Sequence, residues 1–134
     1  MQFPPCQNVP YIIELLTPPA DSGDIEKQLD RFASRYERIL GAGCAVSIPD
    51  NPMGRRRLSA LESIERRNLP IISEQLILHL NPFHDKVEID AFLERAARRS
   101  VRNLLVVRGD GSPELPRLEP AAIDAPYNVV RSVD

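Results

Sequence analysis

A long hydrophobic run is absent from this sequence. No stretch approaches the roughly eighteen consecutive apolar residues that a membrane-spanning helix needs. The first ten residues include Pro4 and Pro5 and lack a basic segment followed by an apolar one, so they do not resemble a secretory signal. We therefore expect no membrane partner and a location in the cytoplasm.

An excess of basic charge is also absent. The 17 basic and 19 acidic side chains leave a formal net charge of −2. This balance gives no electrostatic attraction to the phosphates of a nucleic acid, so we expect no nucleic-acid partner. Cysteine is scarce: Cys6 and Cys44 lie far apart, and neither has a His or Cys at metal-ligand spacing. The sequence therefore predicts neither a metal site nor a disulfide framework, which also fits a reducing cytoplasm.

The sequence does contain short apolar runs that alternate with longer segments of helical period. This alternation is typical of successive βα units that feed a parallel sheet. We expect strands at 11–16, 44–48, 75–80 and 103–107. Helices are expected from near Asp24 to Leu40, over a segment that carries Leu58, Leu61, Ile64 and Leu69, and over a segment that carries Ile89, Phe92, Leu93, Ala96 and Ala97.

The strands begin at intervals of roughly 30 residues, which is the length of a βαβ unit. The predicted fold is therefore α/β, with parallel (β/α) units that form about half of a TIM-type (β/α)₈ barrel. We divide the chain into an N-terminal extension (1–10), the half barrel (11–111) and a proline-rich tail (112–134). The tail is expected to be loop, with at most one short helix near 127–133 that would begin the next unit.

Polar residues near the strand ends are the candidates for a site, because barrel enzymes carry their chemistry there. These residues are Glu14, Asp50, His79 and Asp110. Glu14 lies within an apolar run, where desolvation would raise the pKa of its carboxyl group and suit it to general acid catalysis. Alternatively, Glu14 faces a solvated barrel mouth or pairs with a basic neighbour.

The other candidates also have structural alternatives. His79 lies between two leucines and could be a core histidine that bonds a backbone carbonyl. Arg108, Gly109 and Asp110 follow an apolar strand and could form only a turn, while their Arg-Gly-Asp sequence is too short to indicate cell adhesion. The basic run 55–57 could bind phosphate at a helix start or simply be solvated there.

Four segments, taken in order and spacing, resemble the first four barrel strands of the methylenetetrahydrofolate reductase family. They are Ile-Glu-Leu-Leu-Thr-Pro-Pro at 13–19, Val-Ser-Ile-Pro-Asp-Asn-Pro at 46–52, Leu-His-Leu-Asn at 78–81 and Leu-Val-Val-Arg-Gly-Asp at 105–110. Each motif is common by itself, and the resemblance rests on all four occurring in register over residues 11–111.

The resemblance implies an FAD-dependent oxidoreductase that takes hydride from NAD(P)H and reduces methylenetetrahydrofolate to methyltetrahydrofolate. It implies that Glu14 is the general acid toward the folate, and that His79, Arg108, Gly109 and Asp110 contact the flavin. Asp110 would also approach the folate and lower the flavin potential through its negative charge.

Some positions depart from the family. Ile13, Leu15 and Leu16 stand where aromatic residues are common, and Pro49 stands where a Thr is frequent. The family barrel is about twice as long as this chain, so we expect this chain alone to be inactive and to be completed by a second copy or another chain. The alternatives are a noncatalytic half-barrel interaction or assembly module, and a small α/β ligand-binding domain unrelated to folate.

Overall fold

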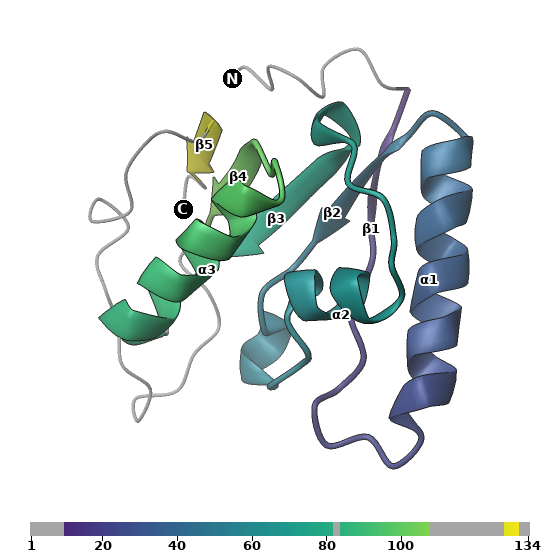
Figure 1. The fold of residues 1–134 in the computed structure, drawn as a ribbon, viewed down its shortest axis with the longest axis horizontal. Helices are drawn as coiled ribbons and strands as arrows, with labels where there is room; N and C mark the ends of the chain where they lie inside the picture. The colour runs from purple at the N-terminus through teal and green to yellow at the C-terminus, as the bar shows by residue number, and fades with distance from the viewer. Residues whose placement is uncertain (1–9, 82–83, 108–127, 132–134) are drawn as a thin grey trace.

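The computed structural model of the chain describes residues 10–81, 84–107 and 128–131 (Figure 1). Its elements are, in chain order, β1 (Ile12–Glu14), α1 (Ile25–Gly41), β2 (Ala45–Ile48), the 3-10 turn η1 (Pro52–Gly54), α2 (Ala60–Arg66), the 3-10 turn η2 (Ser73–Gln75), β3 (Leu76–Leu80), α3 (Lys86–Arg98), β4 (Asn103–Val106) and β5 (Asn128–Arg131). Strands and α-helices alternate from β1 to β4.

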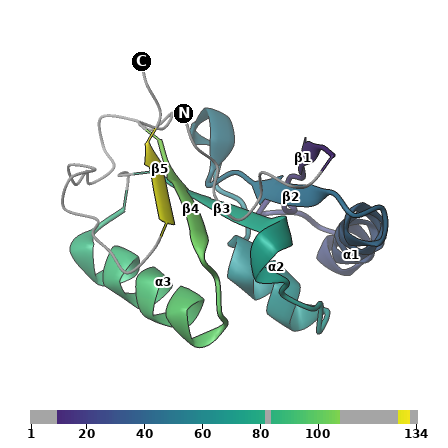
Figure 2. The ribbon, with the colours of Figure 1, turned by 90° about the horizontal axis from the view of Figure 1, so that it is seen from above.

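The strands form one parallel sheet in the order β1-β2-β3-β4-β5. Figure 2 shows α1, α2 and α3 along the same side of this sheet, as right-handed crossovers between successive parallel strands require. The predicted α/β class, the four strands and their sequential order are therefore confirmed.

The expectation for the tail is wrong at one place. Residues 128–131 form β5 rather than loop or helix, and β5 pairs with β4 from Asn103↔Asn128 to Val106↔Arg131. The segment Asn-Val-Val-Arg is short, and it follows a proline-rich stretch without a preceding helical period. Only the free edge of β4, a tertiary feature, gives this segment a partner for its backbone groups.

The sequence predicts the boundaries of α1 well and those of α2 less well. Asp24 is the N-cap of α1, as its predicted start near this residue implies, and Gly43, which has a φ of +75°, follows its end. The second helix is shorter than its apolar pattern suggested, because Leu58 precedes it and Leu69 follows it. The side chain of Ser59 accepts a hydrogen bond from the backbone N–H of Glu62 at 3.1 Å and so fixes its start.

The main core lies between the sheet and the three helices. Strand residues that face the helices, such as Val46, Leu78 and Leu104, are fully buried against helix side chains. The helix side chains of this core include Phe32, Tyr36, Ile39, Leu61, Ile64 and Ala96. The opposite face of the sheet holds a smaller cluster of Ala45, Ile77 and the partly buried Leu105, since successive strand residues point to opposite faces.

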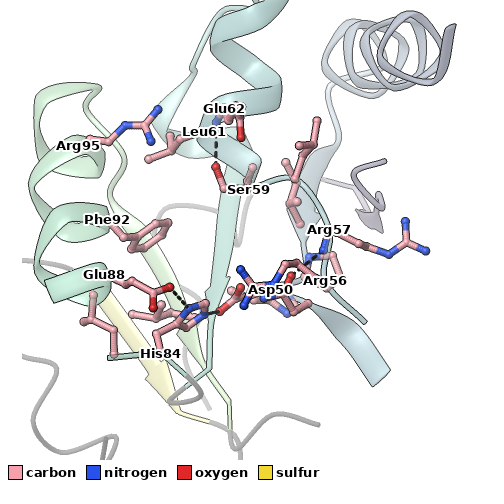
Figure 3. Close-up of a pocket in the computed structure, with 18 of the residues that line it drawn as sticks. Asp50, Arg56, Arg57, Ser59, Leu61, Glu62, His84, Glu88, Phe92 and Arg95 are labelled. Carbon is pink, nitrogen blue, oxygen red and sulfur yellow. Dashed lines mark hydrogen bonds and ion pairs between the residues drawn. The ribbon is translucent and has the colours of Figure 1, made fainter. Parts of the chain in front are cut away.

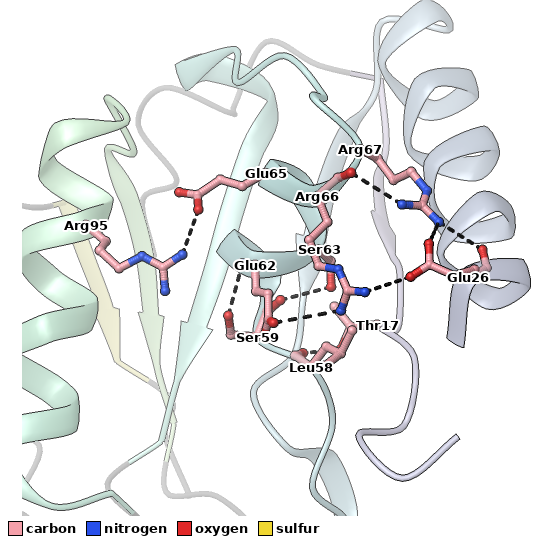
Figure 4. A network of polar contacts seen from close by, with 10 residues as sticks. All are labelled: Thr17, Glu26, Leu58, Ser59, Glu62, Ser63, Glu65, Arg66, Arg67 and Arg95. Carbon is pink, nitrogen blue, oxygen red and sulfur yellow. Dashed lines mark hydrogen bonds and ion pairs between the residues drawn. The ribbon is translucent and has the colours of Figure 1, made fainter. Parts of the chain in front are cut away.

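Ion pairs connect the helices at the surface (Figure 4). Arg67 on the segment after α2 binds Glu26 at 2.5 Å and Asp30 at 3.0 Å, both on α1. Arg95 of α3 binds Glu65 of α2 at 2.7 Å. The Arg67 guanidinium lowers the pKa of Glu26, but exposed pairs of this kind contribute little to stability, and burial of the apolar core dominates.

Candidate functional site

Glu14, Ser47 and His79 lie on the face of the sheet that the three helices leave uncovered. Glu14 is the Cα partner of Ser47, and Ser47 is the Cα partner of Ile77. His79 lies two residues beyond Ile77 and therefore shares its face. Three polar residues from neighbouring strands thus gather near the carboxyl ends of β1, β2 and β3, the edge where parallel α/β proteins bind their ligands.

Ser47 and His79 form the most direct contact of this site. The Ser47 Oγ lies 2.6 Å from the His79 Nε2, and both side chains are at least half-buried. Burial lowers the pKa of His79, while the negative charges of Glu14 and Asp50 oppose this effect. His79 is therefore not an isolated core histidine bonded to a backbone carbonyl, since its partner is a side chain on the neighbouring strand.

Glu14 differs from its expected environment. We expected desolvation within the apolar run, but β1 is the edge strand of the described sheet and all three of its residues are exposed. Ile12 and Ile13, which precede Glu14 in this run, are exposed as well, so the apolar run does not enclose the carboxylate. The structure therefore supports the alternative of a solvated carboxylate, placed beside Ser47 and close enough to affect His79.

Asp50 joins the loops that follow β2 and β3. Its carboxylate accepts hydrogen bonds from the Asn81 backbone N–H at 2.9 Å and from His84 Nε2 at 2.7 Å. The Asn81 Nδ2 donates to the Asp50 carbonyl at 2.7 Å. The hydrogen bond from Asp50 raises the pKa of His84, and Glu88, 3.3 Å from Nδ1, adds to the effect (Figure 3).

A cleft of about 410 Å³ opens beside this loop pair, between α3 on one side and the start of α2 with the segment before it on the other (Figure 3). Asp50, His84 and Glu88 form part of its wall, and Leu61 and Phe92 form an apolar part. The cleft is contiguous with the carboxyl ends of β2 and β3, because Ile48 and His79 also line it. Acidic and basic side chains both line the cleft, so its charge does not indicate whether a ligand would be an anion or a cation.

The Thr-Pro-Pro segment has a structural role. The Thr17 hydroxyl donates to the Leu58 carbonyl at 2.6 Å, and the Leu58 N–H donates to the Pro18 carbonyl at 2.9 Å. The Arg57 guanidinium also donates to the Thr17 carbonyl. The basic run 55–57 lies before Ser59, the N-cap of α2, so it does not begin the helix as expected. Arg55 and Arg56 are exposed, as the solvated alternative holds, whereas Arg57 is partly buried against the loop after β1.

Ser47 and His84 belong to this region although neither is among the residues predicted for it from the sequence. A signal for Ser47 was present: in two consecutive apolar strands, Ser47 and His79 each stand one residue before the last. The His84 contact carried no such signal, because Asp50 and His84 are 34 residues apart in two irregular loops. Arg108, Gly109 and Asp110, the remaining candidates, lie outside the described residues.

Other candidates for chemistry are few in the described part of the chain. Cys44 is a buried free thiol, and no group of three or more His, Cys, Asp or Glu residues there is arranged to hold a metal ion. None of the described helices is long and apolar enough to cross a membrane.

The fold and the polar cluster define an α/β protein with a parallel sheet and polar side chains at the carboxyl ends of its strands. No family model matches the sequence, and comparisons with curated proteins and with solved structures gave no match. The assignment of function therefore depends on the geometry of these residues and on the motifs that they belong to.

Proposed function

We propose that this chain is the first half of a TIM-type barrel of a flavin-dependent oxidoreductase similar to methylenetetrahydrofolate reductase. One observation carries the proposal. Glu14 and His79, to which the resemblance gives the folate-acid and flavin-contact roles, share the helix-free face near the carboxyl ends of β1 and β3. This face becomes the interior of the barrel when such a sheet closes.

The described residues fit one end of a flavin. His79, which bonds Ser47 through Nε2, has a second ring nitrogen on this half-buried surface, and a planar ring with nitrogen and oxygen atoms could bond it. The apolar residues of the same face, Ala45 and Ile77, are buried, so the polar end of the face would make the contact. Bound FAD would supply hydride transfer from NAD(P)H to the methylene carbon of methylenetetrahydrofolate.

Flavin binding provides the first test. Titration of the purified chain with FAD should give saturable quenching of the flavin fluorescence. His79→Ala should weaken binding by about tenfold, the cost of one hydrogen bond to the ligand. Lys27→Ala, on the exposed side of α1, is the control and should bind like the wild type. Absence of saturable FAD binding to the wild-type chain would contradict the proposal.

The role of Glu14 is testable in a barrel completed by a second copy or a partner chain. Glu14→Gln retains the shape but cannot donate a proton, so methylenetetrahydrofolate reduction should fall by about 10²-fold or more. NAD(P)H-driven flavin reduction should change much less, because that half-reaction does not use this proton. Stopped-flow measurements separate the two, and equal losses in both would remove Glu14 from the folate step.

A noncatalytic assembly module is the second candidate, and a specific observation favours it. Ile12 and Ile13 of the edge strand β1 are 44% and 40% exposed, and Tyr11 before the strand and Leu16 beyond it are 72% and 45% exposed. Apolar side chains on an open sheet edge favour pairing with another chain. Association without FAD binding would support this function in place of the first.

A further inference from the structure

We propose that Ser47 is a positioning residue whose hydroxyl donates a hydrogen bond to Nε2 of His79 and holds the imidazole with its proton on Nδ1. Nδ1 then offers an N–H donor to an acceptor atom of the bound ligand. The assignment of that ligand as a flavin rests on the proposed function, whereas the state of the imidazole rests only on the contact between β2 and β3.

Burial and two nearby carboxylates determine the charge of His79. The side chain is half-buried, and desolvation disfavours an imidazolium. The acidic groups that act on it are Glu14 on β1 and Asp50 in the loop after β2, and they oppose this effect without reversing it. The lowered pKa of His79 therefore leaves the ring neutral at pH 7, with one nitrogen as donor and the other as acceptor.

The 2.6 Å hydrogen bond between the Ser47 Oγ and the His79 Nε2 can have either atom as its donor. If Nε2–H donated to the Ser47 Oγ, the hydroxyl hydrogen would need another acceptor. Ser47 is only 8% exposed, and no other described residue accepts from its hydroxyl. A buried donor without a partner costs about 1–3 kcal/mol. If Ser47 donates instead, both groups are satisfied and the ring proton lies on Nδ1.

Nδ1 is the ring nitrogen of His79 that can bond a ligand. No described residue forms a hydrogen bond with this nitrogen. The Nδ1–H of the proposed tautomer is thus available to a ligand at the carboxyl ends of the strands. A flavin ring carries nitrogen and oxygen acceptors, and Nδ1–H can bond any one of them. A ligand that presents only a donor at this position is disfavoured, because two donors cannot satisfy each other.

Nitrogen-detected NMR of the full-length chain tests the tautomer directly. The sequence has two histidines, and His84→Gln assigns the signals of His79. We expect wild-type His79 above its pKa to be protonated at Nδ1. Ser47→Ala should shift the population toward Nε2–H, Ser47→Thr should restore Nδ1–H, and the control Ser63→Ala, a buried hydroxyl on α2, should change nothing.

Two results would overturn the inference: a wild-type His79 protonated at Nε2, or a Ser47→Ala variant that keeps the Nδ1–H tautomer. FAD titration of the same proteins tests the ligand. We expect about tenfold weaker binding for Ser47→Ala and recovery in Ser47→Thr. If the wild type shows the Nδ1–H tautomer but no FAD binding, the proposed function fails and the positioning by Ser47 stands.

Discussion

At the scale of single residues, polar side chains in the apolar strands meet different environments. Glu14 lies on the edge strand and is exposed, whereas Ser47 and His79 lie on inner strands and bond each other. Asn103, also buried, donates to the carbonyls of Ser73 and Leu76 at 2.8 and 3.2 Å. Burial of each residue follows the position of its strand in the sheet, and the buried side chains of Ser47 and Asn103 each form a hydrogen bond.

Tyr36 illustrates the same rule in the helix core. It is fully buried, and its hydroxyl donates to the Pro70 carbonyl at 2.7 Å; burial raises its pKa to about 12. Tyr36→Phe should lower the free energy of unfolding by about 1 kcal/mol, because it removes this bond and retains the ring. Urea unfolding measures the change. The control Tyr11→Phe, at a 72% exposed position, should leave stability unchanged, and an equal effect there would contradict this account.

At the scale of elements, the loop after β2 and the N-terminus of α3 are joined through His84. Its two ring nitrogens face Asp50 and Glu88, whose carboxylates only accept hydrogen bonds. The ring can donate to both only as an imidazolium. Protonation therefore strengthens the link between these two elements at the wall of the cleft.

This link predicts a pH dependence with a definite sign. The pKa of His84 is raised in the folded chain by its bond to Asp50. Its contribution to stability should be complete below about pH 6.5, the ordinary histidine pKa, and should be lost as pH rises through the folded pKa. The loss of unfolding free energy in His84→Gln should thus be larger at about pH 5.5 than at about pH 8.5. An equal loss of unfolding free energy at the two pH values would contradict this prediction.

The pKa of His79 is shifted in the opposite direction from that of His84. Its folded pKa is lowered by burial, so its contribution is present above the ordinary pKa and is lost as pH falls through the folded one. A pH titration followed by proton NMR of the two imidazole Cε1–H signals measures the pKa values of His79 and His84. We expect His84 to titrate above and His79 below their ordinary value, and the reverse order would disprove both assignments.

At the scale of the whole molecule, the described sheet has helices on one side only and an open edge at β1 (Figure 2). We expect self-association through this edge, because its outer side pairs with no other described strand and the side chains of Ile12 and Ile13 are 44% and 40% exposed. Ile12→Lys should reduce the association seen in sedimentation velocity at high concentration. Met53→Lys, at an 88% exposed position in η1, is the control. A wild-type chain that stays monomeric would contradict the expectation.

The sequence by itself determined the βα alternation and the order of the first four strands. The apolar runs around Val46, Leu78 and Leu104 form the strands because each buries one face against helices that carry their own apolar stripes. The same local logic placed the start of α1 at Asp24 and its end before Gly43. These features depend on neighbours within a few residues along the chain.

Tertiary structure decided the rest. The residues 128–131 became a strand because β4 offered an edge. The exposure of Glu14 depends on β1 being an edge, and the contacts Ser47–His79 and Asp50–His84 join residues 32 and 34 positions apart. Hydrogen-bonding partners of this kind are set by strand register and loop path, which no local pattern encodes.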